Sequence, residues 1–259
     1  MTTKRSADTR PVRKLPADRT SRGPLPAGAG APATGASATL VAGFGVLVAC
    51  LFLFGTLAED IRDNEAFVLD ALATPFLHGL ANPTLDGVMT AATTMGSTAV
   101  LPALFVVATI LLLVLRRFGA ELFLAVSSGG ALLINQLMKL FFHRPRPQLP
   151  WAHVQPDFSF PSGHTMNAVA FYFAVAIIVW SVAGRRWGMV AAAAAIVLCT
   201  AVGISRIYLG FHYFTDVVGG ALAGAAWVLI ALAAFRSGRL AGLRNPVGAR
   251  RRRDSRGSP

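Results

Sequence analysis

The sequence predicts an all-helical protein that crosses a membrane about six times, and three observations carry this prediction. The chain of 259 residues is 54% hydrophobic and 14% charged, and its mean hydropathy is +0.56. Its apolar residues form runs long enough to span a bilayer, rather than the stripes of an amphipathic surface helix. Its basic residues gather at the two ends of the chain and in the short turns between the runs, which is typical of a polytopic membrane protein.

Two polar ends enclose a predicted membrane domain at residues 38–236. Residues 1–37 are rich in Arg, Pro, Ala, Gly and Thr and have no apolar periodicity, so we expect a disordered basic tail. The basic region before the first apolar run is also too long for a signal peptide. Residues 237–259 form a second basic tail. The basic residues behind the net charge of +12 lie mainly in the tails and turns. We therefore expect this charge to attract membrane lipids, and we expect no nucleic-acid partner.

The first part of the membrane domain contains two apolar runs and a polar connection between them. Residues 38–57 are long enough to cross the hydrocarbon core as one helix. Residues 59–86 form an acidic, polar connection with room for a short interfacial helix. The next run, at 88–115, contains Pro102 and is longer than one span requires. Its first part is expected to line a polar site through Thr93, Thr94, Gly96 and Ser97.

Four further runs complete the six expected spans, at 120–142, 165–182, 187–204 and 214–235. If both ends of the chain are cytoplasmic, nineteen of the 24 Lys and Arg residues fall on the cytoplasmic side. This asymmetry is the one that orients membrane proteins. The five outer residues are Arg62, Lys139, Arg144, Arg146 and Arg206.

Four of these five outer cations fall in two short segments that also contain histidines, at 139–147 and 205–216. With residues 161–164, where Pro-Ser-Gly-His precedes an apolar run, they make three polar blocks at the outer ends of predicted spans. A structural role is open to single residues: Lys139 can reach the lipid headgroups, and Arg206 can pair with Asp216 to hold two helices. The convergence of all three blocks on one membrane face favours a functional site.

The three blocks resemble the signature of the type-2 phosphatidic acid phosphatase superfamily, which also includes bacterial acid phosphatases and vanadium haloperoxidases. That signature reads Lys, six residues, Arg-Pro; then Pro-Ser-Gly-His; then Ser-Arg, five residues, His, three residues and Asp. This sequence matches it without departure, from Lys139 to Asp216. The six apolar runs are similar to the membrane branch of the superfamily and exclude a soluble acid phosphatase.

The resemblance implies a metal-independent phosphatase of membrane lipid phosphates that uses no cofactor. His212 would attack phosphorus and form a phosphohistidine, His164 would protonate the leaving oxygen, and Asp216 would orient the His212 ring. The expected phosphate ligands are Lys139, Arg146, Ser162, Gly163 and Arg206.

Two further polar residues are weaker candidates for the same site. Arg144 could reach the phosphate or only the rim of the headgroup layer. Asn135 lies one turn before Lys139 and could orient it.

The substrate and the reaction type stay open at this point. A site at the outer face of a bacterial plasma membrane suits phosphatidic acid, phosphatidylglycerol phosphate and polyprenyl diphosphates such as undecaprenyl diphosphate. A lipid phosphotransferase would use the same histidine, with a second lipid in place of water. A non-catalytic membrane protein that keeps the scaffold is the third reading, and the intact signature counts against it. No residue pattern indicates an oligomeric state.

Overall fold

The computed structural model describes residues 33–63, 65, 67–152 and 155–237, and its regular elements there are all helices. The predicted tails, 1–37 and 237–259, lie almost wholly outside these residues. The chain divides into one unit at 1–39 and another at 40–259, and the contacts below lie within the second. The helices are α1 (Ala33–Arg62), α2 (Val68–His78), α3 (Pro83–Thr94), α4 (Val100–Val114), α5 (Phe118–Phe142), α6 (Gly163–Ala183), α7 (Arg185–Tyr208) and α8 (Phe214–Arg236).

The predicted membrane bundle is confirmed by the length and composition of these helices. Within the described residues, five helices are long and apolar enough to span a bilayer: residues 40–62 of α1, and all of α5, α6, α7 and α8. Helix α4 is apolar but shorter. Helix α2 lies in the acidic connection, where a short helix was expected.

The second predicted span differs from the expectation because it consists of two helices, α3 and α4, joined at 95–99. The turn between them packs tightly against α6 and α7. A Cβ atom on Gly96 would lie 2.7 Å from Val202 Cγ1 and 3.1 Å from the carbonyl oxygen of His164. Ser97 Oγ accepts a hydrogen bond from the N–H of Val100 at 3.1 Å and so supports the start of α4. The apolar run is therefore interrupted at a small residue and at a serine that hydrogen-bonds to the first residue of α4.

Helix α3 starts earlier than the hydropathy indicates, because its first turn is fixed by local chemistry rather than by apolar residues. Asn82 caps the helix, since its Oδ1 accepts a hydrogen bond from the N–H of Leu85 at 3.0 Å. Pro83 occupies the first helical position, where no N–H is needed.

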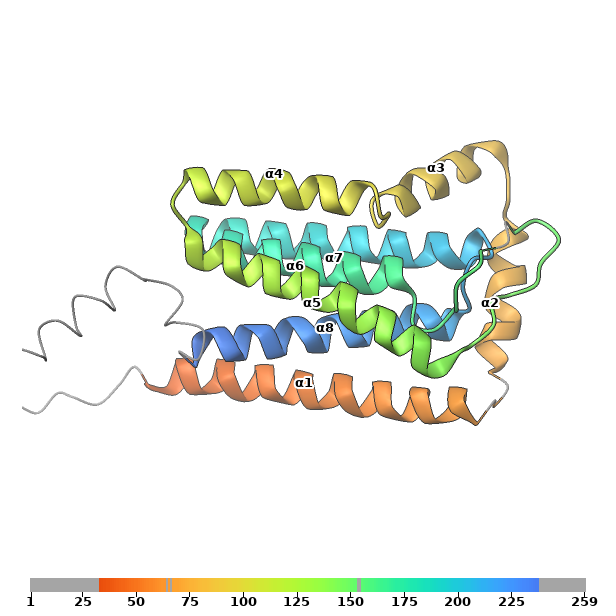
Figure 1. The fold of residues 1–259 in the computed structure, drawn as a ribbon, viewed down its shortest axis with the longest axis horizontal. Coiled ribbons are helices and arrows are strands. Elements are labelled where there is room, and N and C mark those ends of the chain that lie inside the picture. The colour runs from red at the N-terminus through yellow and green to blue at the C-terminus, as the bar shows by residue number, and fades with distance from the viewer. Residues whose placement is uncertain (1–32, 64, 66, 153–154, 238–259) are drawn as a thin grey trace, which may run out of the picture. The chain divides into compact units, whose positions relative to one another are not determined.

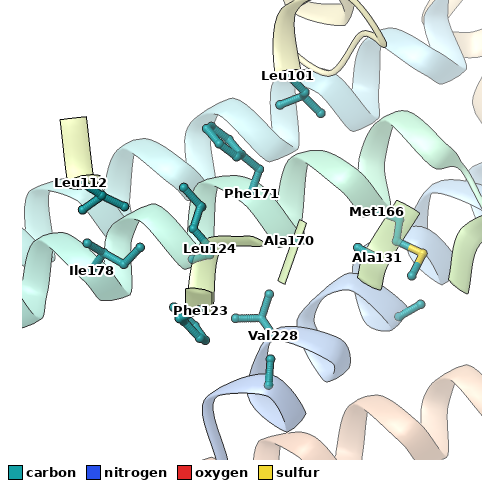
Figure 2. Packing of buried hydrophobic residues seen from close by; sticks show 13 residues of the cluster. Leu101, Leu112, Phe123, Leu124, Ala131, Met166, Ala170, Phe171, Ile178 and Val228 are labelled. Atoms are coloured by element: carbon teal, nitrogen blue, oxygen red, sulfur yellow. The ribbon is translucent and has the colours of Figure 1, made fainter. Parts of the chain in front are cut away.

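Helix α6 is the centre of the bundle and packs against α5, α7 and α8. Its side chains, among them Ala170, Phe171 and Ile178, form the main core together with residues of α4, α5 and α8 (Figure 2). A helix that is apolar on all sides is expected in such a buried position. Large apolar side chains on α1 and α4 are exposed instead, as lipid-facing side chains are.

Glycines of α8 allow this helix to approach the start of α6 closely. A Cβ atom on Gly220 would lie 2.6 Å from the carbonyl oxygen of Ser162, and one on Gly219 would lie 2.4 Å from the ring of Phe160. Small residues at a helix contact let two backbones approach in this way. The contact brings the third polar block against the second.

Helix α2 crosses the end of the bundle at which α7 ends and α8 begins (Figure 1). The long connection from α5 to α6 lies at the same end (Figure 1). This end of the bundle therefore collects the polar blocks.

Candidate active site

The structure brings the three polar blocks together at one end of the bundle. Lys139 lies on the last turns of α5, His164 on the first turn of α6, and Arg206 on the last turn of α7. Each of the buried site residues exposes less than a tenth of its surface; they are Lys139, Arg146, Ser162, Arg206, His212 and Asp216. Burial of so many polar groups at a membrane boundary is costly unless they act on one another or on a ligand.

His212 and Asp216 form a buried pair across the start of α8. His212 Nδ1 lies 3.3 Å from Asp216 Oδ2, four residues further along the chain. The same oxygen accepts hydrogen bonds from the N–H of Tyr213 at 2.9 Å and from Ser159 Oγ. Oδ2 of Asp216 is thus held by three donors, and its position fixes the His212 ring.

The hydrogen bonds of His212 define its tautomer. Because Nδ1 faces a carboxylate, it carries the proton and donates. Nε2 then has a free lone pair, which accepts from Arg146 Nη1 at 3.2 Å. Burial lowers the pKa of His212 to about 4, against the opposing effect of the hydrogen bond and charge of Asp216. The ring is therefore neutral at physiological pH, with its unprotonated nitrogen facing Arg146.

Three buried cations, Lys139, Arg146 and Arg206, lie near one another and form what we term the cation cluster. Each interacts electrostatically with at least one of the others. Arg146 Nη1 also donates to the carbonyl oxygen of Phe211 at 2.7 Å, which ties it to the loop before His212. Like charges this close repel one another, so the cluster favours an anion in its midst.

Asp157 is the carboxylate that meets this cluster. Its Oδ2 accepts from Lys139 Nζ, and its Oδ1 accepts from Arg146 Nη2 at 2.6 Å and from Arg146 Nε at 3.2 Å. Burial alone would raise the pKa of Asp157, but its bonds to Lys139 and Arg146 outweigh burial and hold the pKa below its ordinary value. Asp157 is therefore ionised and forms ion pairs with two of the three cations.

Arg206 is incompletely paired. Its Nη1 donates to Thr93 Oγ1 at 3.0 Å, and its guanidinium carbon lies 4.2 Å from the centre of the Phe211 ring. Its Nε and Nη2 are buried and have no hydrogen-bond partner among the described residues. Buried donors of a charged group without a partner are rare in folded proteins, and they indicate where an anionic ligand would bind.

The start of α6 adds uncharged donors to the site. Ser162 is the N-cap residue, and its N–H donates to the carbonyl oxygen of Asp216 at 2.9 Å. The amides that follow, from Gly163 and His164, belong to the first helical turn, where no intrahelical acceptor exists. His164 interacts electrostatically with the cation cluster and with His212. A helix start of this kind binds anions.

Asn135, which was expected to orient Lys139, contacts the turn before α6. Its side-chain amide donates to the carbonyl oxygen of Pro161 at 3.2 Å. A Cβ atom on Gly163 would lie only 2.9 Å from its Oδ1. Asn135 therefore supports the turn before α6, and glycine at 163 leaves room for it.

Arg144 also differs from the expectation, because it lies behind Asp216 rather than at the cation cluster. Its Nη1 donates to Asp216 Oδ1 at 2.6 Å, and its Nη2 donates to Asp70 Oδ2 at 2.7 Å. Its guanidinium carbon lies 4.4 Å from the centre of the Tyr213 ring. Asp70, on α2, also accepts from the N–H of Thr215 at 2.8 Å. A chain of charges thus joins α2 to the buried carboxylate that holds His212.

A cavity of about 610 Å³ opens from the site into the bundle. Its polar end is lined by Lys139, Arg146, Asp157, His164 and His212. Its other walls are mainly apolar and come from α4, α5 and α6, including Leu101, Phe105, Leu132 and Phe171. Gly96 and Ser97, in the turn expected to line a polar site, are also part of the wall. One cavity therefore presents charged groups at one end and hydrocarbon at the other.

Sequence reasoning missed three residues of this site, namely Asp70, Asp157 and Ser159. None belongs to a spaced block, and carboxylates or hydroxyls in polar connections are usually solvated. An acidic residue shortly before the Pro-Ser-Gly-His block was the available signal for Asp157. Nothing local marks Asp70, whose partners lie on α8 and in the connection that follows α5.

Comparisons with known proteins identify relatives of this chain. Residues 120–239 match the family model described as the PAP2 superfamily. The chain is 34% identical over 175 residues to phosphatidylglycerophosphatase B of Bacillus subtilis, an alignment that covers 66% of this chain and 85% of the relative. It is 29% identical to undecaprenyl-diphosphatase BcrC of the same organism, over 55% of this chain and 72% of the relative.

A solved structure gives the same answer for the fold. The transmembrane PAP2-type phosphatidylglycerolphosphate phosphatase from Bacillus subtilis superposes with a TM-score of 0.67 and 29% identity. The match covers 72% of this chain and 94% of that structure. The chain therefore belongs to the PAP2 superfamily, which the signature blocks indicated, and it is an integral membrane phosphatase.

Proposed function

We propose that this protein hydrolyses the terminal phosphate of membrane lipid phosphates, without a metal ion, through a phosphohistidine on His212. The observation that carries the proposal is the neutral Nε2 of His212 against Arg146 of the cation cluster, in which Arg206 has two donors without a partner among the described residues. A phosphoryl group needs a nucleophile on one side and positive charge around its three equatorial oxygens. Lys139, Arg146 and Arg206 supply that charge.

In the first half-reaction, a bond forms between His212 Nε2 and phosphorus while the bond from phosphorus to the leaving oxygen breaks. Arg146 releases Nε2 and donates to a phosphate oxygen instead. Asp216 accepts from Nδ1 throughout, so it stabilises the positive charge that develops on the ring. His164 gives a proton to the leaving oxygen, which departs as an alcohol or as a lipid monophosphate.

In the second half-reaction, water attacks the phosphohistidine. His164, now neutral, accepts a proton from that water as the new oxygen–phosphorus bond forms and the nitrogen–phosphorus bond breaks. Inorganic phosphate leaves, and His212 returns to its neutral state. Ser162 and the amide of Gly163 would hold the phosphoryl oxygens in both steps through the helix start.

The cavity supports a lipid as the substrate. Its charged end suits a terminal phosphate, and its apolar walls suit an acyl or polyprenyl chain. Phosphatidic acid, phosphatidylglycerol phosphate and undecaprenyl diphosphate all have this form. The names of two relatives, a phosphatidylglycerophosphatase and an undecaprenyl-diphosphatase, support the last two.

We place both ends of the chain in the cytoplasm and the site at the outer face of a bacterial plasma membrane. Arg116 and Arg117 follow α4, and Arg185 and Arg186 begin α7, at the end of the bundle opposite the site. Basic turns favour the cytoplasmic side. Among the described residues, the basic side chains at the other end are Arg62 and four that lie in or beside the site, Lys139, Arg144, Arg146 and Arg206.

The test is phosphate release by the detergent-purified full-length protein in excess EDTA. Phosphatidic acid, phosphatidylglycerol phosphate and undecaprenyl diphosphate are offered in parallel, and His212→Ala is the control. We expect release in EDTA that disappears in the variant, together with a phosphoenzyme label that is stable to alkali and labile to acid. Release that depends on added metal would refute the mechanism. Label that moves to an added acceptor lipid would indicate a phosphotransferase instead.

A further inference from the structure

Asp157 holds the place in which a phosphate is expected. Its side chain is 48% exposed, whereas those of its partners Lys139 and Arg146 are each 8% exposed. Its two carboxylate oxygens bind these two cations, one oxygen to each residue. A mobile solvated carboxylate would gain little from such contacts at a surface, but here it reaches cations that are themselves buried.

The carboxylate is an incomplete substitute for a phosphate. It carries one negative charge and two oxygens, and both oxygens are in use. Arg206 keeps two buried donors that have no partner in the described part of the chain. A terminal phosphate carries up to two charges and three peripheral oxygens, so it can bind all three cations at once. The cation cluster is therefore partly neutralised by Asp157 and fully engaged only by a terminal phosphate.

We propose that Asp157 is an internal counter-anion, which binds Lys139 and Arg146 in the empty enzyme and is exchanged for the phosphoryl group in each turnover. This inference rests on the proposed function, because it requires the cation cluster to be the phosphate site. The exchange alters no covalent bond. The Asp157 side chain turns into solvent as phosphate enters, and it returns as phosphate leaves.

The exchange has a consequence for the product. A ligand that binds only the open form has an apparent dissociation constant equal to its intrinsic one divided by the fraction of the protein in the open form. Three buried cations would otherwise bind inorganic phosphate strongly and slow its release. Competition with Asp157 lowers the affinity for inorganic phosphate, and it lowers the affinity for the substrate's phosphate group by the same factor. The substrate regains affinity through its lipid chain, which occupies the apolar cavity, whereas inorganic phosphate has no such chain.

The test uses Asp157→Asn, which keeps the shape of the side chain and removes its charge. Binding of inorganic phosphate to the purified full chain is measured by calorimetry in the His212→Ala background, so that no phosphoenzyme forms. We expect the dissociation constant to fall about tenfold with Asp157→Asn, which corresponds to a closed form favoured about ten to one. In the active protein, the inhibition constant for phosphate and the KM for the lipid fall together.

Two further variants make the result decisive. Asp157→Ala should tighten phosphate binding as Asp157→Asn does, so the test does not depend on one variant folding. Asp63→Asn removes an exposed carboxylate in the turn after α1 and should leave phosphate binding unchanged. Phosphate binding that is unchanged or weaker in both Asp157 variants would overturn the proposal and make Asp157 a substrate ligand or a structural residue.

The outcome is separable from that of the proposed function. If no lipid is hydrolysed but phosphate binding still tightens on removal of Asp157, the counter-anion proposal is supported and the proposed reaction is wrong. If lipids are hydrolysed and phosphate binding is insensitive to Asp157, the proposed reaction is supported and the counter-anion proposal is wrong. If phosphate does not bind even without Asp157, the cation cluster is not the phosphate site and both fail.

Discussion

Arg206 offers a sharp test of whether the cation cluster binds a ligand. If it does, removal of the guanidinium should lower activity without lowering the stability of the protein. The perturbation is Arg206→Met, which keeps most of the side-chain volume and removes the guanidinium. In the described part of the chain, Arg206 makes one side-chain hydrogen bond, to Thr93, and leaves Nε and Nη2 unpaired. If a phosphoryl group takes both donors, the variant loses two charge-assisted hydrogen bonds.

The size of the effect follows from this count. Each hydrogen bond to a charged group contributes about 1.5–3 kcal/mol, so two such bonds amount to about 3–6 kcal/mol. The expected loss in kcat/KM is therefore about 10²- to 10⁴-fold. Arg206→Lys keeps the charge but loses the forked pair of guanidinium donors, so its kcat/KM should lie between those of Arg206→Met and the wild type.

The stability of Arg206→Met should be equal to or higher than that of the wild type. A buried cation without a full set of partners is costly, and an apolar side chain of similar volume removes that cost. The assays are kcat/KM on a lipid phosphate in mixed micelles and the Tm of the same preparation. Arg185→Met, at the exposed first turn of α7, is the matched control and should change neither.

Two results would refute this reasoning. One is an Arg206→Met protein that keeps more than a tenth of the wild-type kcat/KM. The other is a Tm that falls by several degrees, because Arg206 would then be a structural residue and its unpaired donors would have no role in binding.

The remaining predictions concern the surroundings of the nucleophile. Asp70→Asn should lower kcat about tenfold, equivalent to about 1.4 kcal/mol, with KM little changed. The reason is that Arg144 loses a partner and holds the first turn of α8 less firmly. An unchanged kcat would show that this ion pair is merely structural. Burial lowers the pKa of His212 to about 4, and only the neutral ring attacks. We therefore expect kcat/KM to hold between pH 7 and pH 5 and to decline below pH 5. A decline centred near 6.5, the ordinary pKa of histidine, would contradict the buried position. Gly219→Ala places a methyl group 2.4 Å from the Phe160 ring and should lower the free energy of unfolding by about 1–3 kcal/mol, measured as a drop in Tm; an unchanged Tm would mean that α8 is not packed against this ring.

The sequence by itself determined the long apolar helices and the three polar blocks that the structure brings together. Long apolar runs have few alternatives to a helix in lipid, since every backbone group must be satisfied within the segment. The spacing from His212 to Asp216 predicts that the two side chains meet, and the structure pairs them, with His212 just before the N-cap of α8 and Asp216 in its first turn. These features depend on neighbours within a few residues, so they can be read along the chain.

The tertiary structure alone decided which charges meet. Arg144 was expected at the phosphate or the headgroup rim, but it binds Asp216 and Asp70, which lie far from it in sequence. Asp157 reaches Lys139 only because the connection between α5 and α6 folds back over the end of α5. The split between α3 and α4 depends on the space that α6 and α7 leave beside Gly96. Each of these results from packing between distant segments, which hydropathy and spacing do not encode.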